Sequence, residues 1–397
     1  NESRLRLQFP SLKVITCDFA KDRVIDWEGR LAGIEAVVNT AGIFRSTRRG
    51  RFETVHFEGP KALFEACARL RIPKLVQISA LGADEGARSA FHLTKRQADD
   101  CCITLAQNHG LHGWIVVRPS LVIGRGGQST ALFSALGALP FPPRLGPGNW
   151  KIQPIHISDL ARGIRLLLEH EAALPPRLDF VGPEPLTTDE LTHALRRWLL
   201  LPAAKSLPLP LWLLRASALT AGVFSMGSLS RDSLAMLERG NVAPVAPLRE
   251  VLGWEPRPVL EALLSQPSTQ ADLWHARLYF LKPTLRIGLA LLWIGTALVS
   301  AFIYPLSKSI ALVSGLGVDE NQAVTLVYAG AALDAVLGLL LLFDIRPRVV
   351  GLVQIATVLV FTVLATIAVP AAWLEPFGPL SKNVAVILAT LAMIALE

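Results

Sequence analysis

The sequence of 397 residues is poor in charge, cysteine and tyrosine. Charged residues make up 18% of it and hydrophobic residues 51%, which is more apolar than a typical soluble domain. The four cysteines form no Cys-x-x-Cys pair and no metal-binding spacing with histidine, which indicates reduced thiols acting as small hydrophobic residues. The sequence does not interleave basic and aromatic residues in the way that nucleic-acid-binding proteins do, so we predict no nucleic-acid partner. The only tyrosines are Tyr279, Tyr304 and Tyr328.

The apolar surplus is concentrated after Pro283, in four long runs with very little charge. A bilayer-spanning helix needs about 20 apolar residues, and three of the runs reach that length while the fourth is shorter. This pattern predicts an all-α, four-helix transmembrane bundle, and therefore a lipid bilayer as a partner. The runs are Ile287–Ser307, Ala323–Phe343, Val349–Trp373 and Val384–Leu396.

Basic residues flank these runs unevenly. Lys282 and Arg286 precede the first run, and Arg346 and Arg348 lie between the second and third. Because positive residues favour the cytoplasmic side of a membrane, we expect both ends, and the region before the bundle, to lie in the cytoplasm. The predicted location is the inner or cytoplasmic membrane, with several membrane passes.

One ionisable residue, Asp334, lies in the middle of a predicted span. Such residues are costly in a bilayer, face the bundle interior and often have a function. Gln354, in the next span, is a candidate partner. Two interpretations stay open at this point: Asp334 performs a function, or it only fixes helix packing.

The region before the bundle alternates between strand-like and helix-like segments. The apolar strand Ala36–Asn39 leads into the small-residue turn Thr40-Ala41-Gly42, an amphipathic helix follows, and Leu75–Ser79 is the next apolar strand. A helix that carries Lys95 comes after it. This βαβ order predicts a parallel sheet whose ligands bind at the carboxyl ends of the strands.

The stretch from Glu35 to Lys95 resembles the extended and atypical short-chain dehydrogenase/reductase family. The segments ISALGAD, at Ile78–Asp84, and RPSLVIG, at Arg118–Gly124, are most similar to atypical members related to an accessory subunit of NADH dehydrogenase. The resemblance implies a Rossmann-like α/β sheet with a helical substrate-side region. It also implies NAD or NADP as the cofactor, without deciding between them.

The resemblance assigns catalytic roles to Ser79, which would bind the substrate carbonyl, and to Lys95, which would hold the nicotinamide ribose. The family's Tyr-x-x-x-Lys motif requires a tyrosine four residues before the lysine, and this chain has Phe91 there. A tyrosine becomes an acid–base group only when a cation lowers its pKa, and phenylalanine has no hydroxyl to ionise. We therefore expect the usual proton relay to be absent.

Further cofactor contacts follow from the same resemblance, at the ends of the predicted strands. Asp18 would lie beside the adenine, although a helix-capping role explains its position equally well. The small residues of the turn would let the backbone approach the cofactor. The predicted cofactor-binding residues are Asp18, Asn39, Thr40, Ala41, Gly42, Lys95, Arg118, Pro119 and Ser120.

A Gly-x-x-Gly-x-x-Gly turn, which the family uses to bind the pyrophosphate, is missing from the sequence. The first strand-like segment, Lys13–Cys17, resembles the family's third strand. We therefore expect the natural chain to begin earlier, by roughly fifty residues, the length of a βαβ unit and a little more. The chain would then comprise an N-terminally incomplete nucleotide-binding domain (1–182), a small substrate-side region (183–268) and the membrane domain.

Two further features complete the prediction. His156 and Asp159 lie at a strand-to-helix junction and are expected to be structural, with Asp159 capping the helix. The membrane domain, 273–397, resembles the DoxX-like family. The leading hypothesis is a membrane-anchored oxidoreductase acting on a lipophilic substrate, a quinone or a lipid carbonyl. The alternative is a non-catalytic nicotinamide-binding protein that docks a membrane protein complex.

Overall fold

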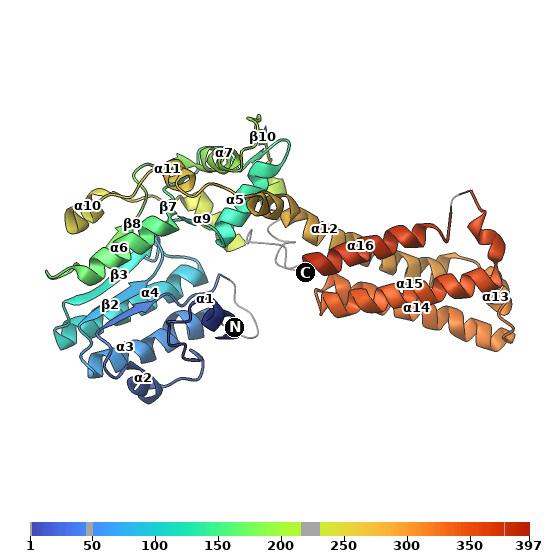
Figure 1. The fold of residues 1–397 in the computed structure, drawn as a ribbon, viewed down its shortest axis with the longest axis horizontal. Helices are drawn as coiled ribbons and strands as arrows, with labels where there is room; N and C mark the ends of the chain where they lie inside the picture. Colours follow the sequence, from blue (N-terminus) through green and yellow to red (C-terminus); the bar gives the residue numbers. More distant parts are fainter. Residues whose placement is uncertain (1, 45–50, 216–230, 377) are drawn as a thin grey trace. The chain divides into compact units, whose positions relative to one another are not determined.

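We describe the protein from a computed structural model that covers residues 2–44, 51–215, 231–376 and 378–397. These residues form two compact units (Figure 1). The first contains the described residues up to Leu214 together with Arg231–Thr269, and the second contains Gln270–Glu397. The boundary expected inside the first unit, at residue 182, stays a prediction.

The first unit is built on a sheet of four parallel strands in the order β1-β2-β3-β8. Because all four run the same way, their carboxyl ends meet at one edge of the sheet. The predicted α/β fold class is therefore confirmed. The strands are β1 (Ala36–Asn39), β2 (Lys74–Ile78), β3 (Gly113–Pro119) and β8 (Arg177–Phe180).

Helices cover both faces of this sheet (Figure 1), because its strands are apolar on both faces. Leu75, Trp114 and Val116 face one side and pack against α2, α3 and α4. Their neighbours Val76 and Ile115 face the other side and pack against α6 and α10. The helices are α2 (Val24–Leu31), α3 (Gly59–Arg69), α4 (Ala90–His109), α6 (Ile157–Glu169) and α10 (Ala246–Leu252).

The predicted strand at Lys13–Cys17 is wrong. This segment is irregular and mostly exposed to solvent, and it follows a short helix, α1 (Glu2–Gln8). A strand is held by hydrogen bonds to a neighbour, and within the described ranges β1 pairs with β2 alone. Lys13–Cys17 therefore has no ladder to join, and its apolar residues do not suffice to form one.

The rest of the first unit consists of short elements beyond the sheet edge. The strand pairs are β4 (Val122–Ile123) with β7 (Ile155–His156), β5 (Pro143–Arg144) with β10 (Leu207–Pro208), and β6 (Lys151–Ile152) with β9 (Leu186–Thr187). The helical elements are a π-helical turn η1 (Thr54–Glu58), α5 (Gln128–Ala138), α7 (Thr188–Trp198), α9 (Arg231–Arg239) and α11 (Val259–Leu264).

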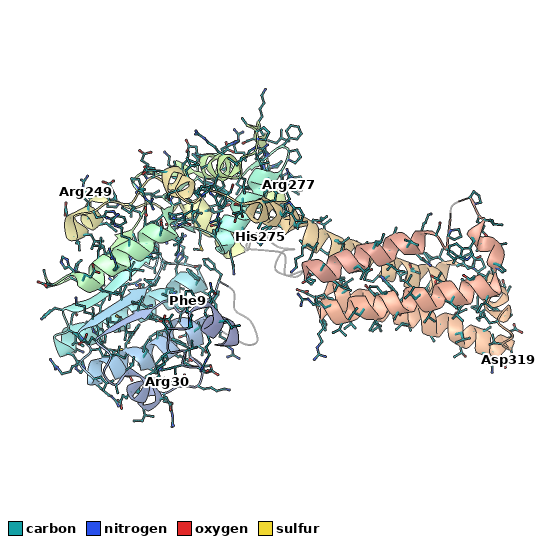
Figure 2. The ribbon with its side chains drawn as sticks, viewed as in Figure 1. Phe9, Arg30, Arg249, His275, Arg277 and Asp319 are labelled. Carbon is teal, nitrogen blue, oxygen red and sulfur yellow. The ribbon has the colours of Figure 1, made fainter. Side chains whose placement is uncertain are left out.

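The second unit is a bundle of long apolar helices. Three of them are long and apolar enough to cross a membrane, and α16 is shorter, as the sequence predicts. Asp319 caps α14 by accepting a hydrogen bond from the Gln322 amide at 2.8 Å (Figure 2). The helices are α12 (Gln270–Leu298), continued by a π-helical turn η2 (Val299–Ile303), α13 (Leu306–Ser314), α14 (Glu320–Leu342), α15 (Pro347–Ala368), a 3₁₀ turn η3 (Pro370–Trp373) and α16 (Lys382–Leu396).

Small residues bring the helices of this bundle close together. A Cβ built on Gly338 of α14 would lie 3.0 Å from both the Ala290 carbonyl oxygen and the Ile294 nitrogen of α12. Glycine at such a position lets two backbones approach, as is common between membrane helices. Large apolar side chains such as Phe302 face outward and are 82% exposed, which suits a lipid-facing surface.

Charged residues gather at one end of the bundle. Arg286, near the start of the first span, pairs with Asp344 in the turn between α14 and α15. Lys282 pairs with Glu397 at 3.0 Å. The basic residues of α12 that precede the first apolar run and those of the α14–α15 turn therefore lie at the same end, as the charge pattern predicts.

Candidate functional site

The carboxyl edge of β1 and β2 gathers several of the predicted site residues. Asn39 ends β1, Ser79 follows β2, and Lys95 reaches the same edge from α4. Ser89 fixes the start of α4, because its hydroxyl accepts a hydrogen bond from the His92 amide at 3.2 Å. Capping at this position starts the helix at Ala90 and places Lys95 beside the strand ends.

Lys95 joins the ends of two strands. Its Nζ donates to the Ala41 carbonyl at 3.1 Å and to the Ile78 carbonyl at 3.0 Å. Burial lowers the pKa of Lys95 to about 8, an effect that the nearby Asp99 partly opposes. An ammonium has three N–H donors, so one remains available for a ligand.

Gly42 leaves room in front of this ammonium. A Cβ at position 42 would lie 3.2 Å from Nζ, which is closer than an ordinary contact. The turn before it is fixed by Asn39, whose Oδ1 accepts from the Ala41 amide at 3.1 Å and whose Nδ2 donates to Gln77 at 2.7 Å. Thr40 and Gly42 are exposed to solvent. The turn therefore offers a ligand an open backbone surface beside a buried cation.

Ser79 is directed at a carboxyl group that the sequence did not reveal. Its hydroxyl donates to Asp99 Oδ2 at 2.5 Å. Asp99 is fully buried, and its Oδ1 has no hydrogen-bond partner among the residues that the structure describes. Burial raises the pKa of Asp99 to about 7, against the lowering effects of Ser79, Lys95, Arg177 and Arg118. Asp99 lies four residues after Lys95, on the same face of α4, and this spacing could have indicated it.

Phe91 lies in a cluster of aromatic rings. It is 6% exposed and stacks on Phe44 with ring centroids 5.1 Å apart. Phe52, His56 and His92 meet its ring edge-on at 5.3 to 6.2 Å. The position that would carry a phenol is therefore part of an apolar wall beside Lys95.

His56 is a second residue that the sequence did not single out. It is fully buried, and its Nε2 accepts from the Ile43 amide at 3.0 Å while Nδ1 contacts Thr94 Oγ1 at 3.0 Å. Because Nε2 is an acceptor, the ring proton sits on Nδ1. Burial, with the nearby Lys95 charge, lowers the pKa of His56 to about 4. A neutral His56 therefore ties the turn after β1 to α4.

Arg118, Pro119 and Ser120 lie at the end of the neighbouring strand β3, where their polar groups bond within the fold. Arg118 forms an ion pair with Asp179 at 2.7 Å, across the β3–β8 pair. The Ser120 hydroxyl donates to the Gln153 carbonyl, and its amide donates to the Phe180 carbonyl at 2.9 Å. Arg118, Pro119 and Ser120 thus hold β8, and their contact with a cofactor stays a prediction.

Asp18 lies in an exposed turn. Its Oδ1 accepts from the Ala20 amide at 3.0 Å, and its carbonyl accepts from the Lys21 and Asp22 amides. Asp22 in turn pairs with Arg30 at 2.7 Å. The local capping interpretation accounts for these contacts, and the adenine contact stays a prediction.

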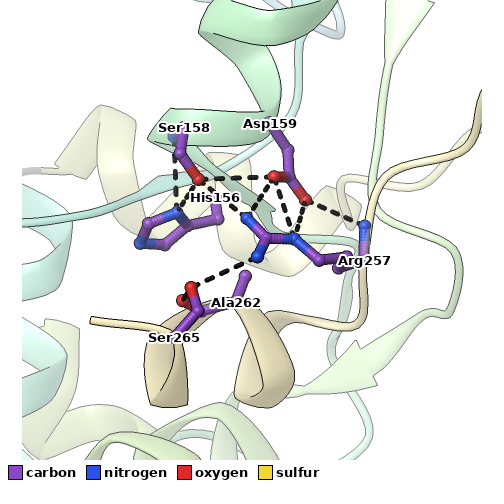
Figure 3. A network of polar contacts seen from close by, with 6 residues as sticks. All are labelled: His156, Ser158, Asp159, Arg257, Ala262 and Ser265. Atoms are coloured by element: carbon purple, nitrogen blue, oxygen red, sulfur yellow. Dashed lines mark hydrogen bonds and ion pairs between the residues drawn. The ribbon is translucent and has the colours of Figure 1, made fainter. Parts of the chain in front are cut away.

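The junction at His156 is structural, although the expected cap is wrong. The His156 side chain, not Asp159, caps α6, because its Nδ1 accepts from the Ser158 amide at 3.3 Å. Asp159 lies in the first turn of α6, and its Oδ1 accepts a hydrogen bond from Arg257 at 2.6 Å (Figure 3). Arg257 also donates to Ser158 and Ser265. Aspartate is used here to pin a distant segment, because the imidazole already satisfies the helix terminus.

This donor set fits one end of a nicotinamide dinucleotide. The hydroxyls of a ribose can accept the N–H of the buried Lys95 ammonium that is not already used. Gly42 leaves space beside this ammonium, and Asn39 fixes the turn that approaches it. The sequence itself carries no glycine-rich turn for the pyrophosphate. No cluster of metal-ligating side chains occurs in the part of the chain that was searched for one, the described residues.

Comparisons with known proteins agree with this geometry. Residues 2–181 match the NAD dependent epimerase/dehydratase family, and residues 290–391 match the DoxX-like family. Two solved structures share the fold at a TM-score of about 0.5. The UDP-glucuronic acid 4-epimerase of Bacillus cereus (TM-score 0.50) is 16% identical and covers 70% of this chain and 87% of its own. The dTDP-glucose 4,6-dehydratase of Streptomyces venezuelae (TM-score 0.51) is 17% identical, and the match covers 70% of this chain and 84% of the dehydratase chain.

Among curated proteins, the chain is similar to subunits of respiratory NADH dehydrogenases. The 40 kDa subunit of the mitochondrial NADH-ubiquinone oxidoreductase of Neurospora crassa is 21% identical over 197 residues, 50% of each chain. Subunit 9 of the mitochondrial NADH dehydrogenase 1 alpha subcomplex of Dictyostelium discoideum is 28% identical over 155 residues, 39% of this chain and 41% of that protein. The chain spans half or less of these relatives' length. The chain therefore combines a domain of the NAD dependent epimerase/dehydratase family with a DoxX-like domain.

Proposed function

We propose that this protein is a membrane-anchored, nicotinamide-dependent oxidoreductase that acts on a lipophilic carbonyl compound or a quinone. The observation that supports catalysis best is the buried Ser79–Asp99 pair beside Lys95. A carboxyl group that gains or loses a proton near neutral pH is suited to acid–base chemistry. Asp99 lies on α4, the same helix that carries Phe91 at the family's tyrosine position.

Lys95 and the turn Asn39–Gly42 would hold the nicotinamide ribose of NAD or NADP. The epimerase and dehydratase of similar fold were solved with NAD bound, and the matching family is described as NAD dependent. The nicotinamide, when bound, supplies or accepts a hydride. Burial of Lys95 strengthens its hydrogen bonds to a ribose by excluding water.

Asp99 and Ser79 would move the proton that accompanies carbonyl reduction. When Asp99 is protonated, its O–H donates to Ser79, and the serine hydroxyl is then free to point at a substrate oxygen. As that oxygen takes the serine proton, Ser79 takes the proton of Asp99, which leaves a carboxylate. The carboxylate accepts from Ser79 again, as in the present geometry, until it regains a proton from solvent.

The membrane unit supports the choice of substrate class, because an anchored site meets molecules that dissolve in the bilayer. Arg286 and Arg346 lie at one end of the bundle, and the preference of positive residues for the cytoplasmic side supports a first unit in the cytoplasm and a protein in the cytoplasmic membrane. The curated relatives are named as subunits of NADH dehydrogenases. A membrane protein complex is therefore a partner worth testing.

We would test this proposal by measuring NADH and NADPH oxidation by the full-length protein in nanodiscs. The acceptors would be a short-chain benzoquinone and a long-chain aldehyde. Asp99→Asn and Ser79→Ala should each lower kcat about 100-fold, because general acid catalysis contributes at least that factor. Asp100→Asn is the matched control, since Asp100 is exposed and pairs with Arg96 and Arg177, and it should change kcat less than about twofold.

The second candidate is a non-catalytic nicotinamide-binding protein, and the aromatic wall around Phe91 favours it. Phe91→Tyr separates the two functions. A rise in turnover after this change would indicate that the wall still surrounds a redox site. Cofactor binding without turnover of either acceptor, in both the wild type and Phe91→Tyr, would exclude the oxidoreductase and leave the binding protein.

A further inference from the structure

The interior of the membrane bundle contains three polar side chains that lack hydrogen-bond partners within the described residues. They are Trp293 of α12, Asp334 of α14 and Gln354 of α15, which are 5%, 5% and 0% exposed. The unpartnered atoms are Trp293 Nε1, Asp334 Oδ1 and both ends of the Gln354 amide. The expected pairing of Asp334 with Gln354 is therefore wrong.

Other polar side chains of the same bundle are satisfied. Thr357 and Thr390 donate to carbonyls one turn earlier on their own helices, at 2.9 and 2.8 Å. Asn383 donates to Thr362 Oγ1 at 2.7 Å. The bundle therefore meets the needs of these polar groups with its own atoms and does not do so for Trp293, Asp334 and Gln354.

The helix register brings the three side chains to nearly one level of the bundle. A Cβ on Gly338 would meet Ile294 of α12, the neighbour of Trp293, and a Cβ on Gly330 would lie 3.7 Å from Phe361 of α15. Helix α15 runs antiparallel to α14, so residues that precede Phe361 on α15 lie beside residues that follow Gly330 on α14. Gln354 is two turns before Phe361, and it therefore lies beside the turn of α14 that leads to Gly338. Asp334 lies one turn before Gly338, so the three residues fall within about one turn, ~5.4 Å of helix axis.

Four unpartnered polar atoms at one level of an apolar bundle are expensive. Each buried donor or acceptor without a partner loses the hydrogen bonds that it makes in water, and hydrocarbon offers no water to compensate. We propose that this level of the bundle is a binding site for the head group of a quinone-class molecule, which supplies the missing partners. Trp293, Asp334 and Gln354 are the residues that recognise it.

The donor and acceptor pattern selects this class of ligand. A quinone presents two carbonyl oxygens, which can accept from the Trp293 indole N–H and the Gln354 amide N–H. Its reduced form presents two hydroxyls, which can donate to Asp334 and to the Gln354 carbonyl oxygen. The surrounding core of Leu289, Leu337, Val350 and Met393 is apolar and suits an uncharged ring. An anionic head group would find no cation among Trp293, Asp334 and Gln354.

We would test the site by binding alone, so that the result does not depend on the proposed enzyme activity. Decyl-benzoquinone is titrated into the full-length protein in nanodiscs, with empty nanodiscs subtracted, and its effect on Tm is recorded. We expect saturable binding that raises Tm. Gln354→Leu and Trp293→Phe should each weaken binding about tenfold or more, the value of one hydrogen bond to a buried group.

Thr390→Val is the matched control, because Thr390 is as buried as Gln354 and bonds only within its own helix. It should bind the probe as the wild type does. Trp293→Phe keeps an aromatic ring in the core and so remains informative if Gln354→Leu fails to fold. Absence of saturable binding by the wild type, or equal binding by both variants and the wild type, would overturn the proposal and indicate groups that are merely hydrated.

Discussion

The sheet edge of the first unit and the level of Trp293 and Gln354 in the membrane bundle treat buried polar side chains differently. At the sheet edge, Lys95, His56 and Asn39 each make two hydrogen bonds or polar contacts to neighbouring elements. In the membrane bundle, the described structure gives no partner to the Trp293 indole N–H or to either end of the Gln354 amide. Both regions exclude water, so the cost of a missing partner is similar or higher in the bundle.

This difference separates two kinds of site. At the sheet edge, buried polar groups build a rigid frame, and one ammonium proton and one carboxyl oxygen, Asp99 Oδ1, remain for chemistry. In the bundle, the Trp293 indole N–H and the Gln354 amide make no hydrogen bond to the described residues, which indicates a role in binding a ligand. Each of the following changes tests one side of this comparison.

The largest effect is expected from removing the ammonium at the sheet edge. Lys95→Met takes away the cation that would hold the ribose, and charge-assisted hydrogen bonds of this kind are worth about 3 kcal/mol. NADH affinity should fall about 100-fold in an isothermal titration. Lys61→Met, which removes a half-exposed lysine of α3, is the control and should leave the affinity unchanged.

The second test uses pH to separate two buried groups of the frame. The raised pKa of Asp99, about 7, contributes stability at low pH that is lost as pH rises toward 7. The lowered pKa of His56, about 4, makes stability rise with pH between about 4 and 6.5. The two slopes oppose each other, so the contributions of Asp99 and His56 should nearly cancel from pH 4.5 to 6, which leaves the rise due to the lowered pKa of His156.

Asp99→Asn should expose the slope of His56. Between pH 4.5 and 6 the unfolding free energy of this variant should rise more steeply than that of the wild type, by about 1.4 kcal/mol per pH unit, the value for one proton. Denaturant unfolding at several pH values, followed by a probe in the first unit, measures it. A variant with the same slope as the wild type would show that Asp99 is not the opposing group.

Smaller effects are expected when two amide side chains of the bundle are replaced, and the two replacements should change the stability in opposite directions. Gln354→Leu removes two unpartnered polar groups and should stabilise the bundle by about 1–2 kcal/mol without a ligand. Asn383→Leu removes the partner of Thr362 and should destabilise it by about 1 kcal/mol. Unfolding in mixed micelles compares them. Destabilisation by both changes would remove the contrast between the two units.

The smallest effect is expected at the turn in front of the ammonium. Gly42→Ala places a Cβ about 3.2 Å from Lys95 Nζ, so the side chain must shift and NADH affinity should fall about fivefold. Gly29→Ala, in α2, meets no atom within 4 Å and should bind NADH normally while stabilising the helix by about 0.5–1 kcal/mol.

The sequence predicts much of this structure because the spacing of apolar residues and the length of the apolar runs indicate where helices and strands form. The apolar runs that became α12, α14 and α15, and the β1–α3–β2 alternation, are local patterns that tertiary packing reinforces. Lys13–Cys17 failed because a strand depends on a neighbour as well as on its own residues. The predicted hydrogen bond between Asp334 and Gln354 was wrong because the sequence indicates only how deep each residue lies along its helix. The depth does not determine the direction in which the side chain points.

The candidate site was predicted in part. Lys95 and Ser79 came from a resemblance, and the structure places both at the expected edge. His56 was missed because its importance arises from burial and from Ile43, 13 residues away, which no local pattern shows. The spacing from Lys95 could have indicated Asp99, but its burial and its bond to Ser79, 20 residues away, appear only in the structure. The His156 cap was missed because histidine is a rare helix cap and the adjacent aspartate is a common one.

The most direct test is a titration of NADH and NADPH into the full-length protein in detergent, repeated with Lys95→Met and Lys61→Met. We predict micromolar binding of at least one cofactor by the wild type and by Lys61→Met, and a loss of about 100-fold in Lys95→Met. Binding of neither cofactor by the wild type, or equal binding by Lys95→Met, would contradict the assignment of the β1–β2 edge as a nicotinamide site.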